Sequence, residues 1–187
     1  MEIITLFVAA VFTNNFILVQ TVGICPFLGV SKKTESALGM GVAVTFVMVL
    51  ASLFTYAIFT WVLVPLEIKF MQTIVFIFVI ASLVQMLEMV LKKVSPSLYA
   101  SLGVYLPLIT TNCAILGIAQ ANLTAVSNLF MAVLNGAFAG IGFTLAIFLM
   151  SGIREKLDKV DVPRPFKGFP ITLITACFMA MAFGVFA

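Results

Sequence analysis

The sequence predicts an all-α integral membrane protein whose six transmembrane helices form two inverted three-helix repeats. Composition, the spacing of apolar segments and a cysteine motif that occurs twice predict this fold class. Of the 187 residues, 63% are hydrophobic and 9% are charged, and the net charge is only +3. Because about a quarter of the residues of a soluble domain are charged, this chain must expose apolar side chains to lipid.

The repeated cysteine motif indicates an internal duplication. The segment CPFLGV begins at Cys25 and the segment CAILGI begins at Cys113, 88 residues later. We therefore expect one membrane domain over 1–187, with repeats of roughly 1–93 and 94–187. Three spans per repeat is an odd number, so the second repeat would insert upside down relative to the first. Inverted repeats place a shared site near the bilayer midplane, often on interrupted helices.

Six apolar segments account for the predicted spans. A helix crosses the hydrocarbon core with about 20 apolar residues. Backbone groups in lipid must pair internally, which favours helices over open strands. The predicted spans are Ile3–Gly29, Ala37–Val64, Phe70–Leu91, Leu98–Ala119, Ala125–Ser151 and Pro170–Ala187.

The first and fourth spans are predicted to be interrupted near their cysteines. Gly23 and Pro26 lie in the first span, which is longer than one crossing needs, and Pro107 and Gly117 lie in the fourth. Proline removes a backbone donor and clashes with the preceding turn. Carbonyl groups freed in this way must be covered by protein or a wet cavity. The polar residues that could cover them are Asn14, Asn15, Thr110, Thr111 and Asn112.

The basic residues predict the orientation of the spans. Lys69 alone lies in a loop on one side of the membrane, whereas nine basic residues lie in loops on the other side. The nine are Lys32, Lys33, Lys92, Lys93, Arg154, Lys156, Lys159, Arg164 and Lys167. The positive-inside rule places these nine residues in the cytoplasm and both termini outside.

The two motif cysteines are the candidate functional residues. Cysteine is a common buried hydrophobe, so a structural role for Cys25 and Cys113 is the ordinary interpretation, and we interpret Cys177 as packing. The repeated context favours metal binding, since inversion would bring both thiols to one depth. The chain has no histidine, so a metal would take thiolate or oxygen ligands. Iron–sulfur clusters usually need four cysteines, so this hypothesis implies a partner subunit; a Cys25–Cys113 disulfide is the alternative pairing.

Other polar residues indicate less about function. Glu88 is either a functional intramembrane carboxylate or the partner of Lys92 in an i,i+4 pair near the cytoplasmic helix end. In the loop over Gly152–Phe169, the i,i+4 spacing of Glu155 and Lys159 predicts that the fifth helix continues into the cytoplasm for a turn or two. No nucleophile–base pair, phosphate-binding loop or nucleotide fingerprint occurs in the sequence. The chain alone therefore has no complete active site, and nothing indicates a nucleic-acid partner.

Four segments resemble the RnfA/NqrE family of membrane subunits, and the resemblance covers essentially the whole chain. They are the segments NNF at 14–16, GICPFLGVSKK at 23–33, LPLITTNCA at 106–114 and GIREK at 152–156. The RnfA branch of this family belongs to the Rnf complex, an ion-translocating ferredoxin:NAD oxidoreductase. The NqrE branch belongs to the sodium-translocating NADH:quinone reductase. The NNF segment, the Cys25–Pro26 pair and the short loop over Pro65–Lys69 are closer to the Rnf branch, and the quinone reductase branch is the alternative.

This resemblance implies electron transport between ferredoxin and NAD across a bacterial or archaeal cytoplasmic (inner) membrane, coupled to Na⁺ or H⁺ translocation. It implies a [2Fe-2S] cluster that Cys25 and Cys113 share with two further cysteines of a paralogous membrane subunit, RnfE, of opposite orientation. A single iron with four cysteine ligands is the alternative cofactor. The other implied partners are Rnf subunits B, C, D and G. A non-redox inverted-repeat ion transporter and a structural scaffold are the competing functions.

Overall fold

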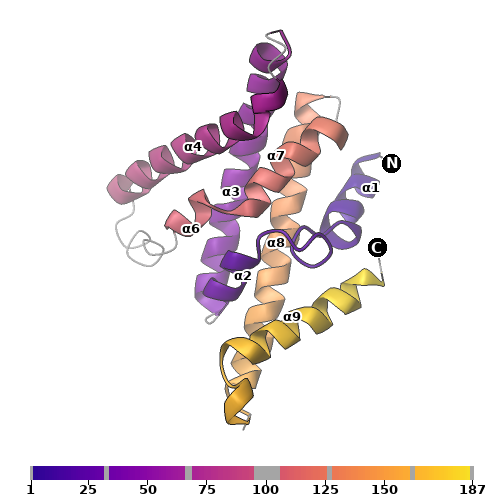
Figure 1. Ribbon diagram of the computed structural model, residues 1–187, viewed down its shortest axis with the longest axis vertical. Coiled ribbons are helices and arrows are strands. Elements are labelled where there is room, and N and C mark those ends of the chain that lie inside the picture. The colour runs from indigo at the N-terminus through magenta and orange to yellow at the C-terminus, as the bar shows by residue number, and fades with distance from the viewer. Residues whose placement is uncertain are drawn as a thin grey trace.

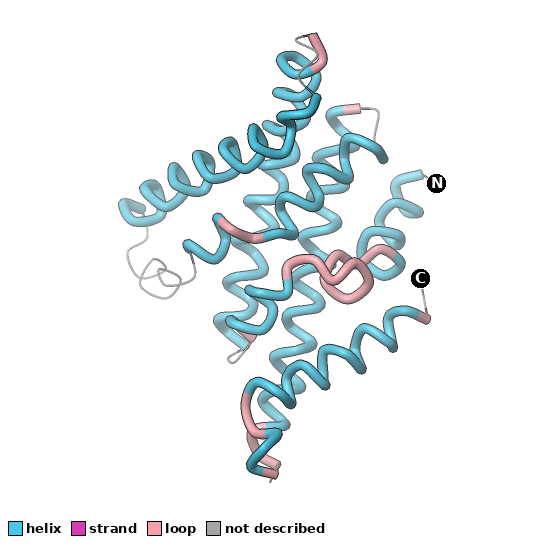
Figure 2. The backbone as a smooth tube through the Cα atoms, viewed as in Figure 1, coloured by secondary structure: helices cyan, strands magenta, loops and turns pink. Residues whose placement is uncertain are grey.

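The computed structural model describes residues 2–31, 34–65, 69–94, 106–125, 128–160 and 163–185. All regular elements in these ranges are helical, which confirms the predicted all-α class for this part of the chain (Figures 1 and 2). In chain order they are α1 (Glu2–Val8), η1 (Ala9–Thr13), α2 (Ile24–Val30), α3 (Thr34–Ile58), η2 (Phe59–Leu63), η3 (Lys69–Met71), α4 (Gln72–Val94), α6 (Leu106–Thr110), α7 (Cys113–Ala125), α8 (Leu129–Leu157), η4 (Arg164–Phe166) and α9 (Phe169–Gly184).

Three helical segments in the described ranges are long and apolar enough to cross a membrane. They are Thr34–Leu63, Gln72–Val90 and Leu129–Leu157. Two shorter apolar helices, Ile4–Thr13 and Phe169–Gly184, accompany them. Several apolar helices of this kind are compatible with a multi-pass membrane protein. The first part of the predicted fourth span, 98–105, lies outside the described residues.

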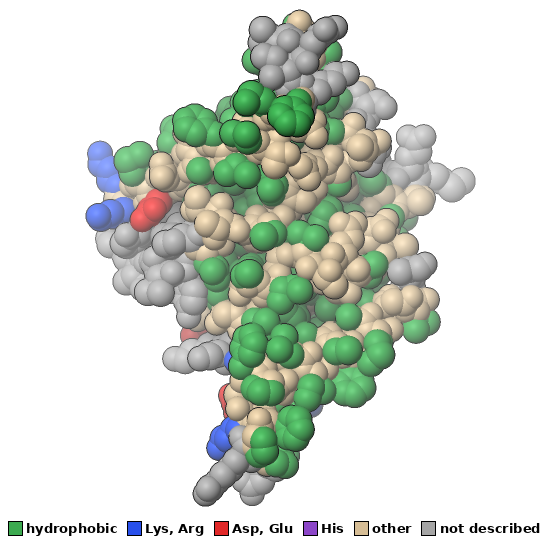
Figure 3. Space-filling model, viewed as in Figure 1, with side chains coloured by type: hydrophobic (Ala, Val, Ile, Leu, Met, Phe, Trp, Pro, Cys, Tyr) green, Lys and Arg blue, Asp and Glu red, His purple; other side chains and the backbone are tan. Residues whose placement is uncertain are grey.

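Large hydrophobic side chains are exposed along the helices. Phe70, Trp61 and Phe78 are 96%, 79% and 76% exposed. Figure 3 shows the visible charged side chains at the left, beside the end of α4, and at the bottom, beside the α8–α9 connection. Hydrophobic side chains cover much of the face between these two places. Soluble monomers rarely expose apolar patches of such extent, so this surface suits a lipid environment.

The centre of the fold is an antiparallel pair of helices, α3 and α8 (Figure 1). At one end of the pair, the Thr34 hydroxyl donates to Glu155 Oε2 over 3.3 Å. At the other end, Ser52 lies over Gly136, where an added Cβ would stand 2.5 Å from the serine Oγ. Because the start of α3 meets the end of α8 and the reverse, the two helices cross the assembly in opposite directions.

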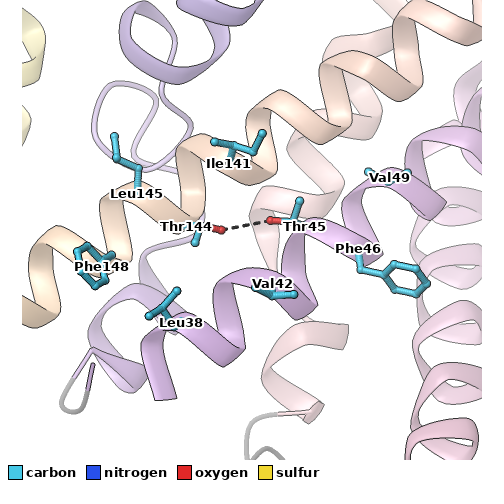
Figure 4. Close-up of a pocket in the computed structure, with 9 residues that line it drawn as sticks. All are labelled: Leu38, Val42, Thr45, Phe46, Val49, Ile141, Thr144, Leu145 and Phe148. Carbon is cyan, nitrogen blue, oxygen red and sulfur yellow. Dashed lines mark hydrogen bonds between the residues drawn. The ribbon is translucent and has the colours of Figure 1, made fainter. Parts of the chain in front are cut away.

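Two glycine–threonine contacts join the middle of this pair. A Cβ on Gly41 would lie 2.5 Å from the Thr144 methyl, and one on Gly140 would lie 2.7 Å from the Thr45 methyl. The two threonine hydroxyls are 3.2 Å apart (Figure 4). Small residues allow membrane helices to approach closely, and hydroxyls can hydrogen-bond across such contacts. The contact is reciprocal: Gly41 of α3 faces Thr144 of α8, and Gly140 of α8 faces Thr45 of α3. On each helix the threonine lies four residues after the glycine.

The threonine pair and the side chains around it line a groove of about 750 Å³ (Figure 4). Its walls are apolar side chains of α3 and α8, among them Val42, Phe46, Ile141 and Phe148. None of its nine lining residues belongs to either cysteine motif. Its lining is compatible with contact to lipid, and it takes no part in the site described below.

The remaining helices pack around this central pair. Helix α7 lies against α3, η1 lies against α8, and α4 contacts α3, α6 and α7. Helix α9 contacts α8 and η1. Phe27 of α2, Met40 of α3, Ile115 of α7 and Phe143 of α8 are fully buried where these elements meet. The core is therefore built from both halves of the chain.

Helix α8 runs beyond the predicted end of the fifth span. It continues to Leu157, whereas the sequence predicts the span to end at Ser151. Lys159 Nζ lies 3.9 Å from Glu155 Oε1, and both side chains are mostly exposed. This confirms the predicted continuation of the helix, which the i,i+4 pair supports.

Candidate functional site

The first helix break runs from Asn14 to Gly23, between η1 and α2. The buried side chain of Asn15 stabilises it by hydrogen bonds. Asn15 Nδ2 donates to the carbonyls of Val11 and Gly142 over 3.0 and 3.1 Å. Asn15 Oδ1 accepts from the backbone N–H groups of Ile17 and Leu18 over 3.1 and 3.3 Å. Asn15 therefore satisfies backbone groups that the break frees, as predicted for the polar residues near the motifs.

The end of this break has an unusual backbone. Thr21 has φ +57° and Gly23 has φ +89°, both in the left-handed region. A β-branched residue is a genuine outlier there, and such strain persists only where the surroundings impose it. Gly23 has no room for a side chain, because an added Cβ would lie 2.9 Å from the Ala114 Cβ and 3.3 Å from Asn112 Oδ1.

The short helix α2 carries Cys25 and is anchored at its carboxyl end. Arg154 Nη1 donates to the Leu28 carbonyl over 2.7 Å and to the Ser31 hydroxyl over 2.8 Å. A cation at this end also interacts favourably with the helix dipole. The sequence predicted only a role in membrane orientation for Arg154. It did not predict the contact of Arg154 with α2. The signal available was the predicted extension of the fifth helix, which places Arg154 on a rigid element.

The second helix break lies at Thr111 and Asn112, between α6 and α7. Asn112 is the N-cap of α7: its Oδ1 accepts from the Ala114 N–H over 3.0 Å. Its side chain is 4% exposed, and its Nδ2 has no hydrogen-bond partner among the described residues. Cys113 is the first residue of α7, and its Sγ lies 3.9 Å from the Thr111 carbonyl oxygen. The structure therefore has a helix break shortly before each motif cysteine, where the sequence predicts interruptions.

The two breaks pack directly against each other. Gly23 contacts Asn112 and Ala114, and Gly117 lies against Val22. Helix α2 also contacts α6. Figure 2 shows both breaks as loop segments in the middle of the helix assembly. Sequence neighbours of both motif cysteines are therefore in contact, although 88 residues separate the two thiols along the chain.

Both motif cysteines, together with Cys177, are exposed free thiols. The alternative Cys25–Cys113 disulfide is therefore not formed in this structure. Cys113 borders a cavity of about 310 Å³ with Asn112 and residues of α4. Cys177, which we interpreted as packing, borders a separate cavity of about 260 Å³ that also touches Thr21 and Ile24.

This donor set fits half of an iron centre. Among the described residues, no group of three or more His, Cys, Asp or Glu side chains is placed to hold a metal ion. Two thiols supply half of the four cysteine ligands that iron–sulfur clusters usually need. The unpaired Asn112 amide beside Cys113 is a buried donor that an added acceptor would satisfy. The arrangement thus suits a metal centre whose remaining ligands come from another subunit.

Glu88, the other candidate residue, lies elsewhere. It is half-buried on α4, four residues before the exposed Lys92. It lines neither cavity that borders a cysteine. The structure therefore does not bring Glu88 into the cysteine site, and the choice between its two interpretations stays open.

Comparison with known proteins identifies the family. The model of the Rnf-Nqr subunit membrane proteins matches residues 3–187. The chain belongs to the Rnf-Nqr family. This Rnf-Nqr protein is 56% identical over 183 residues to the A subunit of the Na⁺-translocating ferredoxin:NAD⁺ oxidoreductase complex of Acetobacterium woodii, covering 98% of this chain and 95% of the relative.

Two further relatives are named as the A subunit of an ion-translocating oxidoreductase complex. One comes from Actinobacillus pleuropneumoniae serotype 5b and is 53% identical over 97% of this chain and 94% of the relative. The other comes from Escherichia coli O9:H4 and is 52% identical over the same shares. These relatives confirm the resemblance seen in the sequence. Their shared name also places this Rnf-Nqr chain with the A subunits.

Proposed function

We propose that this chain is the A subunit of an ion-translocating ferredoxin:NAD oxidoreductase complex and acts there in electron transport within the membrane. The names of the relatives support this proposal over a subunit of the quinone reductase. We infer that the chain works as one subunit inside this complex. We expect a paralogous membrane subunit of opposite orientation beside it, together with the remaining subunits of the complex.

We further propose that Cys25 and Cys113 hold an iron centre with two cysteines of that paralogue. The observation that carries this proposal is the contact of Gly23 with Ala114, which joins the two cysteine-bearing breaks. A [2Fe-2S] cluster is the proposed cofactor, and a single iron held by four cysteines is the alternative. When bound, such a centre supplies one-electron transfer within the membrane.

The chain's own residues prepare this site in several ways. Asn15 and Asn112 satisfy backbone groups at the two breaks. Arg154 fixes the helix that carries Cys25. Helices α3 and α8 support both breaks, because α2 and α7 each contact these two helices. Exposure of both thiols leaves them accessible to a second subunit.

The arrangement of helices supports inverted repeats. Helices α3 and α8 are antiparallel, and their reciprocal contacts join Gly41 to Thr144 and Gly140 to Thr45. A pseudo-two-fold axis in the membrane plane, passing between the two threonines, would relate the halves in this way. We propose six spans with both termini outside and the basic loops in the cytoplasm. Ion translocation would be coupled to electron transfer by alternating exposure of the two halves.

The test is the redox signal of the purified complex that contains this chain. We expect bound iron and a reducible optical and electron paramagnetic resonance signal. Replacing either thiol, in Cys25→Ser or Cys113→Ser, should abolish this signal because each removes a ligand. Cys177→Ser is the matched control and should keep it. Iron and signal retained in both motif variants would refute the proposed ligands.

A competing function is an ion transporter that needs no redox chemistry. It predicts flux of Na⁺ or H⁺ in liposomes that contain this chain alone, without a reductant. The proposed function predicts no such flux, because the centre requires a second subunit. Flux from the isolated chain with unchanged rate in Cys25→Ser would favour the transporter.

A further inference from the structure

We propose that the side-chain amide of Asn112 donates a hydrogen bond to a sulfur of the iron centre and raises its reduction potential. The proposal rests on the function proposed above. It assigns a positioning and tuning role to a residue that does not bind the metal. Hydrogen bonds to cluster sulfurs are among the features that set reduction potentials.

The first support is the place of Asn112 between the two motifs. It directly precedes Cys113 in the chain, and its Oδ1 lies 3.3 Å from the Cβ position of Gly23, two residues before Cys25. It also borders the cavity that Cys113 lines. No acceptor in the described part of the chain pairs with its amide, so an acceptor bound beside Cys113 would satisfy it.

The second support is the fixed orientation of this side chain. Its Oδ1 accepts the Ala114 N–H over 3.0 Å, so the Nδ2 group must point away from the first turn of α7. This Nδ2 is the one buried side-chain nitrogen or oxygen atom among the described residues that lacks a partner. Buried polar groups in proteins are almost always paired, and each exception needs an explanation.

The other buried asparagines show that this fold ordinarily satisfies its amides. Asn15 Nδ2 donates to two carbonyls. Asn122 Nδ2 donates to Ser52 Oγ and to the Ala132 carbonyl over 3.1 and 3.2 Å. Asn135 Nδ2 donates to Asn122 Oδ1 over 2.8 Å. The unpaired amide occurs at the residue beside the proposed ligand.

The two motifs differ at this position. Ile24 precedes Cys25, whereas Asn112 precedes Cys113. At the position before the cysteine, the second motif therefore has a side-chain amide and the first motif does not. Reduction adds negative charge to an iron–sulfur centre, and an N–H donor stabilises the more negative form. The donor should raise the potential.

The experiment compares Asn112→Ser with the matched control Asn122→Ser in the purified complex. Serine caps helices about as well as asparagine, so Asn112→Ser keeps an acceptor for Ala114 and removes the amide. Asn122 lies ten residues after Asn112, about 15 Å away along the same helix at 1.5 Å per residue. Iron and sulfide are measured first, and then the midpoint potential of the centre.

We expect unchanged iron and sulfide in both variants. In Asn112→Ser the reduction equilibrium should shift about tenfold towards the oxidised form, which lowers the midpoint by about 59 mV for a one-electron couple. Asn122→Ser should leave the midpoint unchanged. An intact centre with the wild-type midpoint in Asn112→Ser would overturn the proposal, because its amide would then serve packing or partner contact only.

A second measurement detects the hydrogen bond directly in the wild-type complex. Complex labelled with ¹⁵N in the asparagine side-chain amide should show a hyperfine coupling to ¹⁵N in the pulsed resonance spectrum of the reduced centre. The coupling should be absent in Asn112→Ser and present in Asn122→Ser. Iron without this coupling in the wild-type complex overturns the hydrogen bond alone. A wild-type complex without iron and sulfide overturns the proposed function itself.

Discussion

The first helix break takes ten residues, 14–23, and leads into the seven-residue helix α2, whereas the second takes residues 111–112 and opens the 13-residue helix α7. Both breaks present a cysteine at the start of a helix, but they reach it differently. The long break depends on distant anchors: Asn15 bonds to Gly142 and Arg154 bonds to Leu28. The short break depends on a local cap from Asn112.

This difference shows how the two halves depend on each other. Both anchors of the first break, Gly142 and Arg154, belong to α8, the central helix of the second half. Helix α7, which follows the second break, lies against α3, the central helix in the first half of the chain. Each cysteine-bearing break is therefore supported by a helix from the other half of the chain.

The largest effect is expected at Gly23. Gly23→Ala should lower the free energy of unfolding by about 2–4 kcal/mol, because it adds left-handed strain of about 1–2 kcal/mol and an overpacked contact with Ala114. Thermal unfolding of the detergent-purified chain measures this. Gly152→Ala is the control and should not destabilise, since nothing lies within 4 Å of its Cβ position. Equal stability of the two variants would contradict the close contact of the breaks.

The two capping asparagines should differ in their contributions. Asn15→Ala should cost about 2–3 kcal/mol, because it leaves several buried backbone groups without partners. Asn112→Ala should cost about 1 kcal/mol, the usual value of a lost N-cap. Unfolding midpoints of the two variants, measured side by side, test this order. The reverse order would mean that the second break, not the first, needs the stronger support.

Removal of Arg154 should affect one thiol more than the other. Arg154→Ala should lower the free energy of unfolding by about 2 kcal/mol, the typical size of a hydrogen bond from a charged donor. It should also speed maleimide labelling of Cys25 in the full-length chain without changing the rate at Cys113, because Arg154 holds α2 only. All labelled chains carry Cys177→Ser, so that the third cysteine does not react. A parallel increase at both cysteines would show that Arg154 stabilises the whole assembly instead.

The smallest effect is expected at the threonine pair, where α3 and α8 make matching contacts. Thr45→Val and Thr144→Val should each cost about 0.6 kcal/mol, the mean value for hydrogen bonds between membrane helices. The double variant should cost less than the sum, because both single changes remove the same 3.2 Å contact. Full additivity of the two single effects would argue against a direct contact between the two hydroxyls.

Local signals in the sequence predicted much of the fold. Apolar length predicted the long helices, and the Glu155–Lys159 spacing predicted the extension of α8. Gly23 lies at the end of the first break, as predicted, whereas Pro107 lies inside α6 and the second break follows at 111–112. Each of these follows from residues close together in the chain. The number of spans and the single domain stay predictions, since part of the fourth span lies outside the described residues.

The site was predicted less completely, because its contacts join distant segments. Duplication and inversion predicted that Cys25 and Cys113 approach each other, and the structure places their sequence neighbours in contact. The bond from Arg154 to Leu28 and the unpaired amide of Asn112 could not be predicted, since both depend on which helix faces meet. Iron ligation by the two cysteines stays a prediction.

The central claim is that the two helix breaks bring both motif thiols into one site. The most direct measurement attaches nitroxide spin labels to Cys25 and Cys113 in the full-length chain carrying Cys177→Ser and records low-temperature spectra. We predict strong dipolar broadening in the doubly labelled chain and none in chains labelled at either cysteine alone. A doubly labelled spectrum equal to the sum of the two single-label spectra would contradict the claim.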